Sequence, residues 1–178
     1  MIKLKNILNE DETKKLRIFD FDDTLVKSNS RIKVTDKNGN ERWLSAGEYA
    51  VYTQKPGDKM DYSEFKKVID PKEIKAVTKI LRNFYKANGN RTITILTARG
   101  VVQPIQDFMR DIGIERINIV AVDSSDPKKK SDWIEGKIKL GYNDIFFIDD
   151  SPKNVAAVKE LQKKYPHLKW QIKLARYS

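Results

Sequence analysis

The chain has 178 residues, of which 34% are charged and 39% hydrophobic, so it can form one compact domain rather than a disordered chain. It lacks cysteine, which excludes disulfides and thiolate chemistry, and it has no apolar run near the roughly 18 residues of a membrane span. The net charge of +10 favours phosphorylated or polyanionic partners, unless the lysines only cover solvated helix faces.

Short apolar runs and helical segments alternate along most of the chain. The runs predict buried strands at residues 16–21, 92–97, 117–122 and 145–148, with a weaker fifth at 170–174. Helical spacing covers residues 71–87, 101–112, roughly 129–140, and 152–165. This alternation predicts parallel βαβ units, and therefore a three-layer α/β sandwich with a mostly parallel central sheet.

Local signals mark where some of these helices begin and end. Asp70-Pro71 is a favourable helix start, because an N-cap residue precedes proline at the first helical position. Ser151-Pro152 repeats this signal, and Asn88-Gly89 favours a helix end.

Residues 26–69 interrupt the alternation. The turn-forming residues 36–40 separate two extended segments, 31–34 and 41–44, which predicts a β-hairpin. Residues 45–69 mix glycine, proline, aromatic and charged residues without a clear period. We interpret residues 26–69 as a small insert beside the functional site, within a single domain of residues 1–178.

Two pairs of carboxylates follow predicted strands. Asp20 and Asp22 end the first run, where the alternation of an extended chain would point both side chains the same way. Asp149 and Asp150 end the run at 145–148, and the carboxyl ends of parallel strands meet at one edge of a sheet. Such carboxylates can act as nucleophile and general acid/base, or as Mg²⁺ ligands, although an isolated Asp-x-Asp is commonly only a turn.

Hydroxyl and cationic groups accompany these carboxylates. Thr97, Ala98 and Arg99 follow the run at 92–97, where a hydroxyl and backbone N–H groups could hold phosphate oxygens. Three lysines, residues 128–130, begin the next helical segment. One of them could neutralise a bound phosphoryl group, or all three could form a solvated patch.

In this order, the motifs resemble those of the haloacid dehalogenase (HAD) superfamily over residues 16–174. Residues 20–24 (DFDDT) match the family's DxDxT box, Thr97 its hydroxyl motif, and Asp149-Asp150 its acidic motif, with a lysine before the last. The resemblance implies a HAD-like Rossmannoid fold in which residues 26–69 form a small cap. It also implies a magnesium-dependent phosphatase in which Asp20 is transiently phosphorylated and Asp22 is the acid/base partner. An acidic residue at Asp22 accompanies phosphatases in this family, whereas its ion-pumping ATPases carry threonine.

The same resemblance implies which residues hold Mg²⁺. The ligands would be the Asp20 carboxylate, the backbone carbonyl of Asp22, and Asp150, with Asp149 bound directly or through water. Asn154 occupies the second acidic position of the family's GDSxxD form, which departs from that form but suits the DD form.

The phosphoryl group would be bound by Thr97, Ala98, Arg99 and Lys129, and Thr97 would donate to it. The catalytic lysine would be Lys130, because Trp133 and Ile134 then fall where the family's following helix is apolar. Lys129 and Lys128 remain alternatives for this role.

The expected substrate is a nucleotide or a nucleic-acid terminal phosphate, because a small cap and a basic surface suit such a substrate. Similar motifs occur in polynucleotide 3′-phosphatases and 5′-nucleotidases. The insert interleaves cations with aromatic residues that could stack bases or simply pack on the core: Arg31, Lys33, Lys37, Arg42, Trp43, Tyr49, Tyr52 and Lys55.

Two alternatives remain open, a small-metabolite phosphatase and a catalytically idle module that binds nucleic acid or protein. The first residues contain no apolar run of signal-peptide length, so we expect a cytoplasmic protein without membrane attachment. No obligate protein partner is indicated by the sequence.

Overall fold

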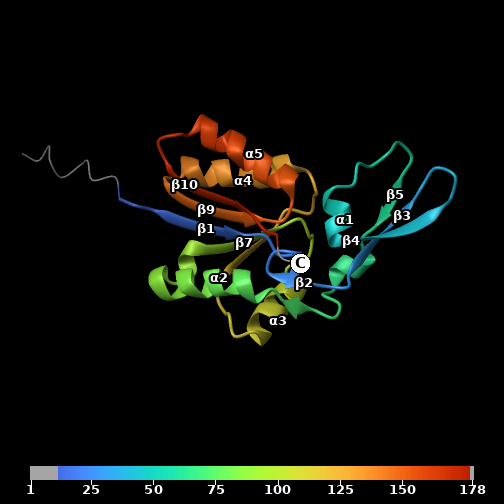
Figure 1. Cartoon of the computed structure of the whole chain (residues 1–178), viewed down its shortest axis with the longest axis horizontal. Coiled ribbons are helices and arrows are strands. Elements are labelled where there is room, and N and C mark those ends of the chain that lie inside the picture. Colours follow the sequence, from blue (N-terminus) through green and yellow to red (C-terminus); the bar gives the residue numbers. More distant parts are fainter. Residues whose placement is uncertain (1–11, 177–178) are drawn as a thin grey trace, which may run out of the picture.

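The computed structural model describes residues 12–176, which are built around a five-stranded parallel sheet (Figure 1). Its strands lie in the order β10-β9-β1-β7-β8. Their bounds are β1 (Lys15–Phe19), β7 (Ile93–Thr97), β8 (Asn118–Ala121), β9 (Asp144–Asp149) and β10 (Lys169–Leu174). All four strand pairings are parallel, so the predicted α/β class with a parallel sheet is confirmed.

Helices cover both faces of this sheet (Figure 1). Helices α2 (Lys75–Asn88) and α3 (Gln103–Asp111) pack on one face, where Phe19 contributes to the core. Helices α4 (Pro127–Lys139) and α5 (Pro152–Lys164) pack on the other face over Ile18. Because β1 and β9 are buried on both sides, their interiors are mostly apolar, and the buried Arg17 of β1 is paired with Asp144 of β9.

Two of the predicted helix boundaries are confirmed. The Ser151 side chain accepts a hydrogen bond from the N–H of Asn154 and so caps α5, which begins at Pro152. Helix α2 ends at Gly89, whose φ of 79° suits glycine. No helix within residues 12–176 is long and apolar enough to span a membrane.

The predicted start of α2 at Asp70-Pro71 is wrong by several residues. Asp70 adopts a φ of 45°, and its side chain accepts a hydrogen bond from Asn29 instead of capping a helix. The next residues form strand β6 (Lys72–Glu73), which pairs with β2 (Val26–Lys27). This pairing holds the chain extended, so the helix begins only at Lys75.

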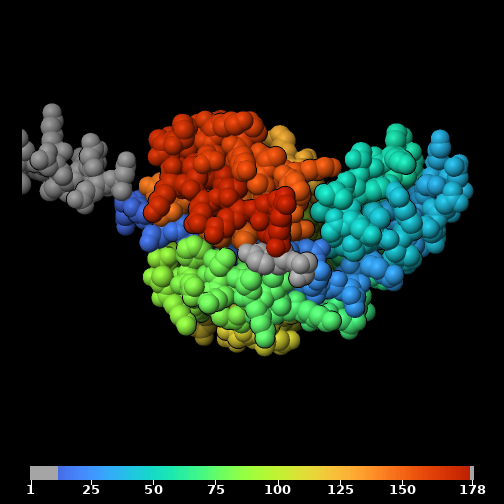
Figure 2. All heavy atoms as spheres, in the orientation of Figure 1, coloured from blue at the N-terminus to red at the C-terminus, as the bar shows by residue number. Residues whose placement is uncertain are grey.

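The ribbon of β2 and β6 forms the base of the insert, which projects as a lobe on one side of the main body (Figure 2). Strands β3 (Arg31–Thr35) and β4 (Glu41–Ser45) form an antiparallel hairpin. Three short elements were not expected: α1 (Ala46–Ala50), β5 (Lys59–Asp61), which pairs with β3, and the 3-10 helix η2 (Ser63–Lys66). A further turn of 3-10 helix, η3 (Asn90–Thr92), leads into β7.

Candidate active site

Three carboxylates meet at the carboxyl ends of the two central strands β1 and β9. Asp20 directly follows β1, and its N–H donates to the carbonyl of Ile148 at 3.0 Å, which fixes the chain beside β9. Asp149 ends β9 and Asp150 follows it. Each of the three side chains places a carboxylate oxygen within 4.8 Å of the others. The structure thus brings Asp20, Asp149 and Asp150 together.

Lys130 of α4 places its ammonium between two of these carboxylates. Its Nζ donates to Asp20 Oδ1 and to Asp149 Oδ2, at 2.7 Å each, and its side chain is 3% exposed. Burial opposes the charged form, but Asp149 and Asp20 outweigh this effect and raise the pKa of Lys130. The neighbouring Lys128 and Lys129 are exposed, so the structure places only Lys130 of the three in the site.

Asp149 has its oxygens occupied by protein donors. Oδ1 accepts from the N–H of Ser151 at 2.8 Å, and Oδ2 accepts from Asn154 Nδ2 at 3.0 Å in addition to Lys130. Burial and the adjoining carboxylates, Asp20 foremost, raise the pKa of Asp150 to about 9. Lys130 compensates the charge of Asp149 but forms no ion pair with Asp150. A bound cation would therefore relieve the unfavourable burial of the Asp150 charge more than that of Asp149.

Thr24 connects two of the carboxylate positions, a role that was not predicted. Its fully buried hydroxyl donates to Asp20 Oδ2 at 3.0 Å and accepts from the N–H of Asp150 at 3.1 Å. The sequence did place Thr24 inside the DFDDT box, which was the available signal. Together, Thr24 and Lys130 hold both oxygens of Asp20.

Asp22 points toward Arg99 and is not a member of the three-carboxylate group. Arg99 donates from Nε to Asp22 Oδ2 at 2.8 Å and from Nη2 to Oδ1 at 2.7 Å. Asp22 nevertheless lines the same small cavity as Asp20. Strand β1 ends at Phe19, and the chain turns after Asp22, with Asp23 at a φ of 55°.

The Arg99 side chain is fully buried, and its N–H groups donate hydrogen bonds to other residues of the protein. Besides Asp22, it donates through Nη1 to the carbonyls of Phe65 at 3.0 Å and Lys67 at 2.6 Å. Arg99 thus joins Asp22 to the insert. The backbone N–H of Arg99, which was expected to hold a phosphate oxygen, donates instead to the Thr97 hydroxyl at 3.2 Å.

These side chains surround a cavity of about 60 Å³. Its walls include Asp20, Asp22, Lys130, Asp149, Asp150 and Asn154, together with the predicted residues Ala98 and Arg99. Thr97 does not line it; the Thr97 side chain is buried, and its hydroxyl accepts from the N–H of Arg99 at 3.2 Å. Lys129, also predicted to bind phosphate, is exposed and outside the cavity.

The fold and site define an α/β protein with a buried acidic centre and one internal lysine at the carboxyl edge of a parallel sheet. Comparisons of the chain with models of known protein families, with characterised proteins and with solved structures found no match. The chemistry of the site therefore has to be argued from its own geometry.

Proposed function

We propose that this protein is a magnesium-dependent phosphomonoesterase of the HAD type, with a HAD-like Rossmannoid core and residues 26–69 as its cap. The observation that carries the proposal is the placement of Asp20. Its carboxylate lies in a phosphoryl-sized cavity, held by Lys130 and Thr24 and facing Asp149 and Asp150. A catalytically idle binding module has no evident use for this costly set of buried charges.

The donor set suits Mg²⁺. Hard cations prefer oxygen ligands, and Asp20 and Asp150 supply carboxylate oxygens from neighbouring strand ends. Lys130 supplies one positive charge against three clustered carboxylates, so negative charge remains for a cation to balance. Asp149, whose oxygens already accept from protein donors, fits a supporting position behind Asp150. Bound Mg²⁺ would offset the charge of the phosphoryl oxygens.

The proposed chemistry uses two aspartates in turn. An Asp20 oxygen attacks phosphorus, the bond to the leaving oxygen breaks, and Asp22 donates the proton that makes an alcohol. Asp22 then takes a proton from the water that attacks the aspartyl-phosphate, which releases phosphate and restores Asp20. Lys130 stabilises the negative charge on Asp20 and on the phosphoryl group, and Arg99 orients the Asp22 carboxylate.

We propose a nucleotide or a nucleic-acid terminal phosphate as the substrate. The 60 Å³ cavity is far smaller than the roughly 300–1,000 Å³ of pockets that enclose whole ligands, so only the phosphoryl group fits inside it. The remainder of the substrate must lie outside it, and the net charge of +10 on the whole chain favours an anionic one.

Phosphate release from a panel of substrates tests this proposal. Mononucleotides, 3′- and 5′-phosphorylated oligonucleotides, sugar phosphates and p-nitrophenyl phosphate should be compared with Mg²⁺ and with EDTA. We expect Mg²⁺-dependent release that is fastest from a nucleotide or an oligonucleotide. Faster release from sugar phosphates would favour a metabolite phosphatase, and no release from any substrate would contradict the proposal.

A further inference from the structure

A second, larger pocket adjoins the catalytic cavity. It has a volume of about 440 Å³ and lies between the insert and the loops that follow β7 and β8. Tyr49 and Phe65 of the insert and Ala98, Arg99 and Ser125 of the core line both spaces. A group in the larger pocket is therefore beside a phosphoryl group in the smaller one.

Two tyrosines form a fixed aromatic wall of this pocket. The rings of Tyr49 and Tyr62 meet edge to face, with centroids 5.8 Å apart. Their hydroxyls are 2.9 Å apart, and the Tyr49 hydroxyl donates to Ser125 Oγ at 3.0 Å, across the boundary between insert and core. Tyr62 is nevertheless 42% exposed, so part of its ring remains available to a flat ligand.

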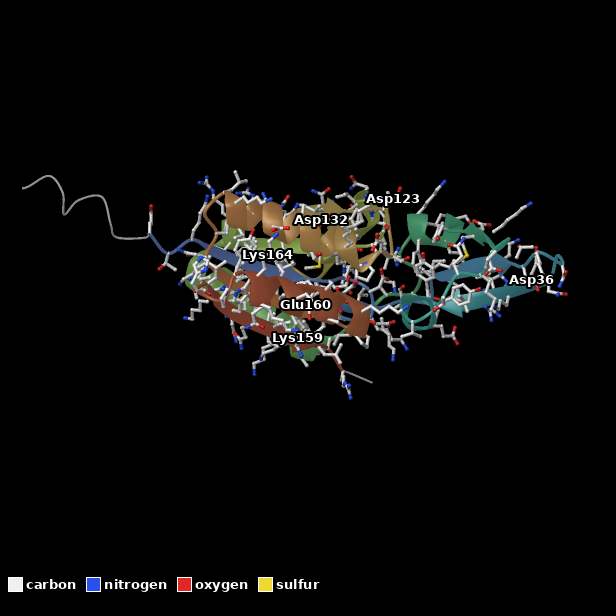
Figure 3. All side chains as sticks on the ribbon, turned by 90° about the horizontal axis from the view of Figure 1, so that it is seen from above. Asp36, Asp123, Asp132, Lys159, Glu160 and Lys164 are labelled. Atoms are coloured by element: carbon white, nitrogen blue, oxygen red, sulfur yellow. The ribbon has the colours of Figure 1, made fainter. Side chains whose placement is uncertain are left out.

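An aspartate with an unusual backbone stands at the polar edge of the pocket. Asp123 has a φ of 51°, and its exposed carboxylate lines the pocket with no hydrogen-bond or ion-pair partner within residues 12–176. A Cβ added to Gly100 would lie 2.3 Å from Asp123 Oδ1, so glycine at position 100 leaves room for the Asp123 side chain in its present orientation. Figure 3 shows Asp123 where the core meets the insert. The pocket thus pairs an aromatic wall with a free hydrogen-bond acceptor.

We propose that this pocket is the subsite for a single unpaired nucleobase, which stacks on Tyr62 and donates hydrogen bonds to Asp123. This inference rests on the proposed function, because it names the leaving group of the same site. A volume of 440 Å³ accommodates one nucleoside, and a base whose pairing edge faces Asp123 cannot be paired, so the substrate is a mononucleotide or a frayed strand end. Guanine fits best, since its N1–H and amino group present two adjacent donors to a carboxylate.

A kinetic comparison of substrates with and without a base tests the subsite. The ratio of kcat/KM for guanosine 5′-monophosphate to that for ribose 5-phosphate measures the contribution of the base. Because stacking of a base on an aromatic ring is worth about 1–3 kcal/mol, we expect Tyr62→Ala to lower this ratio about 5- to 150-fold. Asp123→Asn keeps the side-chain shape and should abolish the preference for guanine over uracil. Trp43→Ala is the matched control, because Trp43 is an exposed aromatic of the same insert that does not line the pocket.

Equilibrium dialysis of free guanosine against the full chain separates this inference from the proposed function. We expect saturable binding to the wild type that Tyr62→Ala weakens about fivefold or more, with circular dichroism reporting whether each variant is folded. Guanosine binding without phosphatase activity would support the subsite and overturn the proposed function. Phosphatase activity with a kcat/KM that does not depend on the base, and no binding of guanosine, would contradict the subsite. The two tyrosines would then serve only to pack the insert against the core.

Discussion

The guanidinium of Arg99 holds the carboxylate of Asp22 through two hydrogen bonds, of 2.8 Å from Nε and 2.7 Å from Nη2. Its third nitrogen donates to the carbonyls of Phe65 and Lys67, which belong to the insert. Because Arg99 follows strand β7, one buried side chain connects the proposed acid/base residue, the parallel sheet and the insert.

Removal of this guanidinium should destabilise the protein strongly. Arg99→Ala leaves the Asp22 carboxylate and two carbonyls without donors, and breaking a buried ion pair costs about 3–5 kcal/mol. Urea unfolding measures the loss in the free energy of unfolding. Arg110→Ala removes an exposed ion pair with Asp107 and serves as the control, with an expected change of about 0.5 kcal/mol or less. A cost below about 1 kcal/mol for Arg99→Ala would show that Asp22 and the insert do not depend on Arg99.

Lys130→Met should make the fold more dependent on magnesium. The substitution keeps an apolar stem but leaves Asp20 and Asp149 without their shared cation, at a cost of about 3–5 kcal/mol. Mg²⁺ should then raise the melting temperature of the variant more than that of the wild type, because the ion offsets the same charges. The exposed Lys129 gives the matched control, Lys129→Met. Equal Mg²⁺ responses in all three proteins would contradict the assignment of a metal to this group of carboxylates.

The Thr24 hydroxyl should matter both to stability and to activity. Thr24→Val preserves the shape but removes the donor to Asp20 and the acceptor for the N–H of Asp150, at a cost of about 1–3 kcal/mol. Thr24→Ser retains the hydroxyl and should recover most of the loss in both unfolding free energy and kcat/KM. If Thr24→Ser lost as much stability and activity as Thr24→Val, the result would contradict this role of the hydroxyl, because serine retains it.

Stability should depend on pH in opposite ways with and without magnesium. The pKa of Asp150 is raised from its ordinary 3.8 to about 9, so the metal-free folded state holds a proton that the unfolded chain releases. The free energy of unfolding in EDTA should therefore fall as the pH rises through this window. Mg²⁺ requires the ionised carboxylate, so its stabilising effect should grow with pH.

Thermal melts from about pH 5 to about pH 9, in EDTA and in Mg²⁺, measure both trends. Asp150→Asn should flatten the pH dependence in EDTA and weaken the Mg²⁺ effect. A Mg²⁺ stabilisation that is independent of pH would count against Asp150 as a ligand.

The carboxylate positions could be predicted because strand ends are visible in the sequence and parallel strands end at one edge. The preference for Lys130 came from the family resemblance, which expects an apolar helix face at Trp133 and Ile134, and Ile134 is buried. The ion pair between Asp22 and Arg99 could not be predicted in this way. It depends on a turn after each strand, and on partners far apart in the sequence.

The insert was the least predictable part of the fold. Strand β5 has only three residues and is stabilised by pairing with β3, which no local pattern reveals. Helix α1 did carry a local signal, because Ser45 and Glu48 form a capping box, and this spacing was overlooked. Strand β6 was not predicted because the preceding Asp70-Pro71 favours a helix start. The pairing of β6 with β2 overrides this local preference.

The central claim is that Asp20 forms an aspartyl-phosphate, and the most direct test is phosphoenzyme trapping. Wild type and Asp20→Asn would be mixed with a phosphate-labelled form of the best substrate and Mg²⁺, quenched in acid and examined by mass spectrometry. We predict an alkali-labile phosphate on the peptide that contains Asp20, together with loss of phosphate release in the variant, which should remain folded by circular dichroism. Turnover by Asp20→Asn at the wild-type rate, or a phosphate bound to a different residue, would contradict the account.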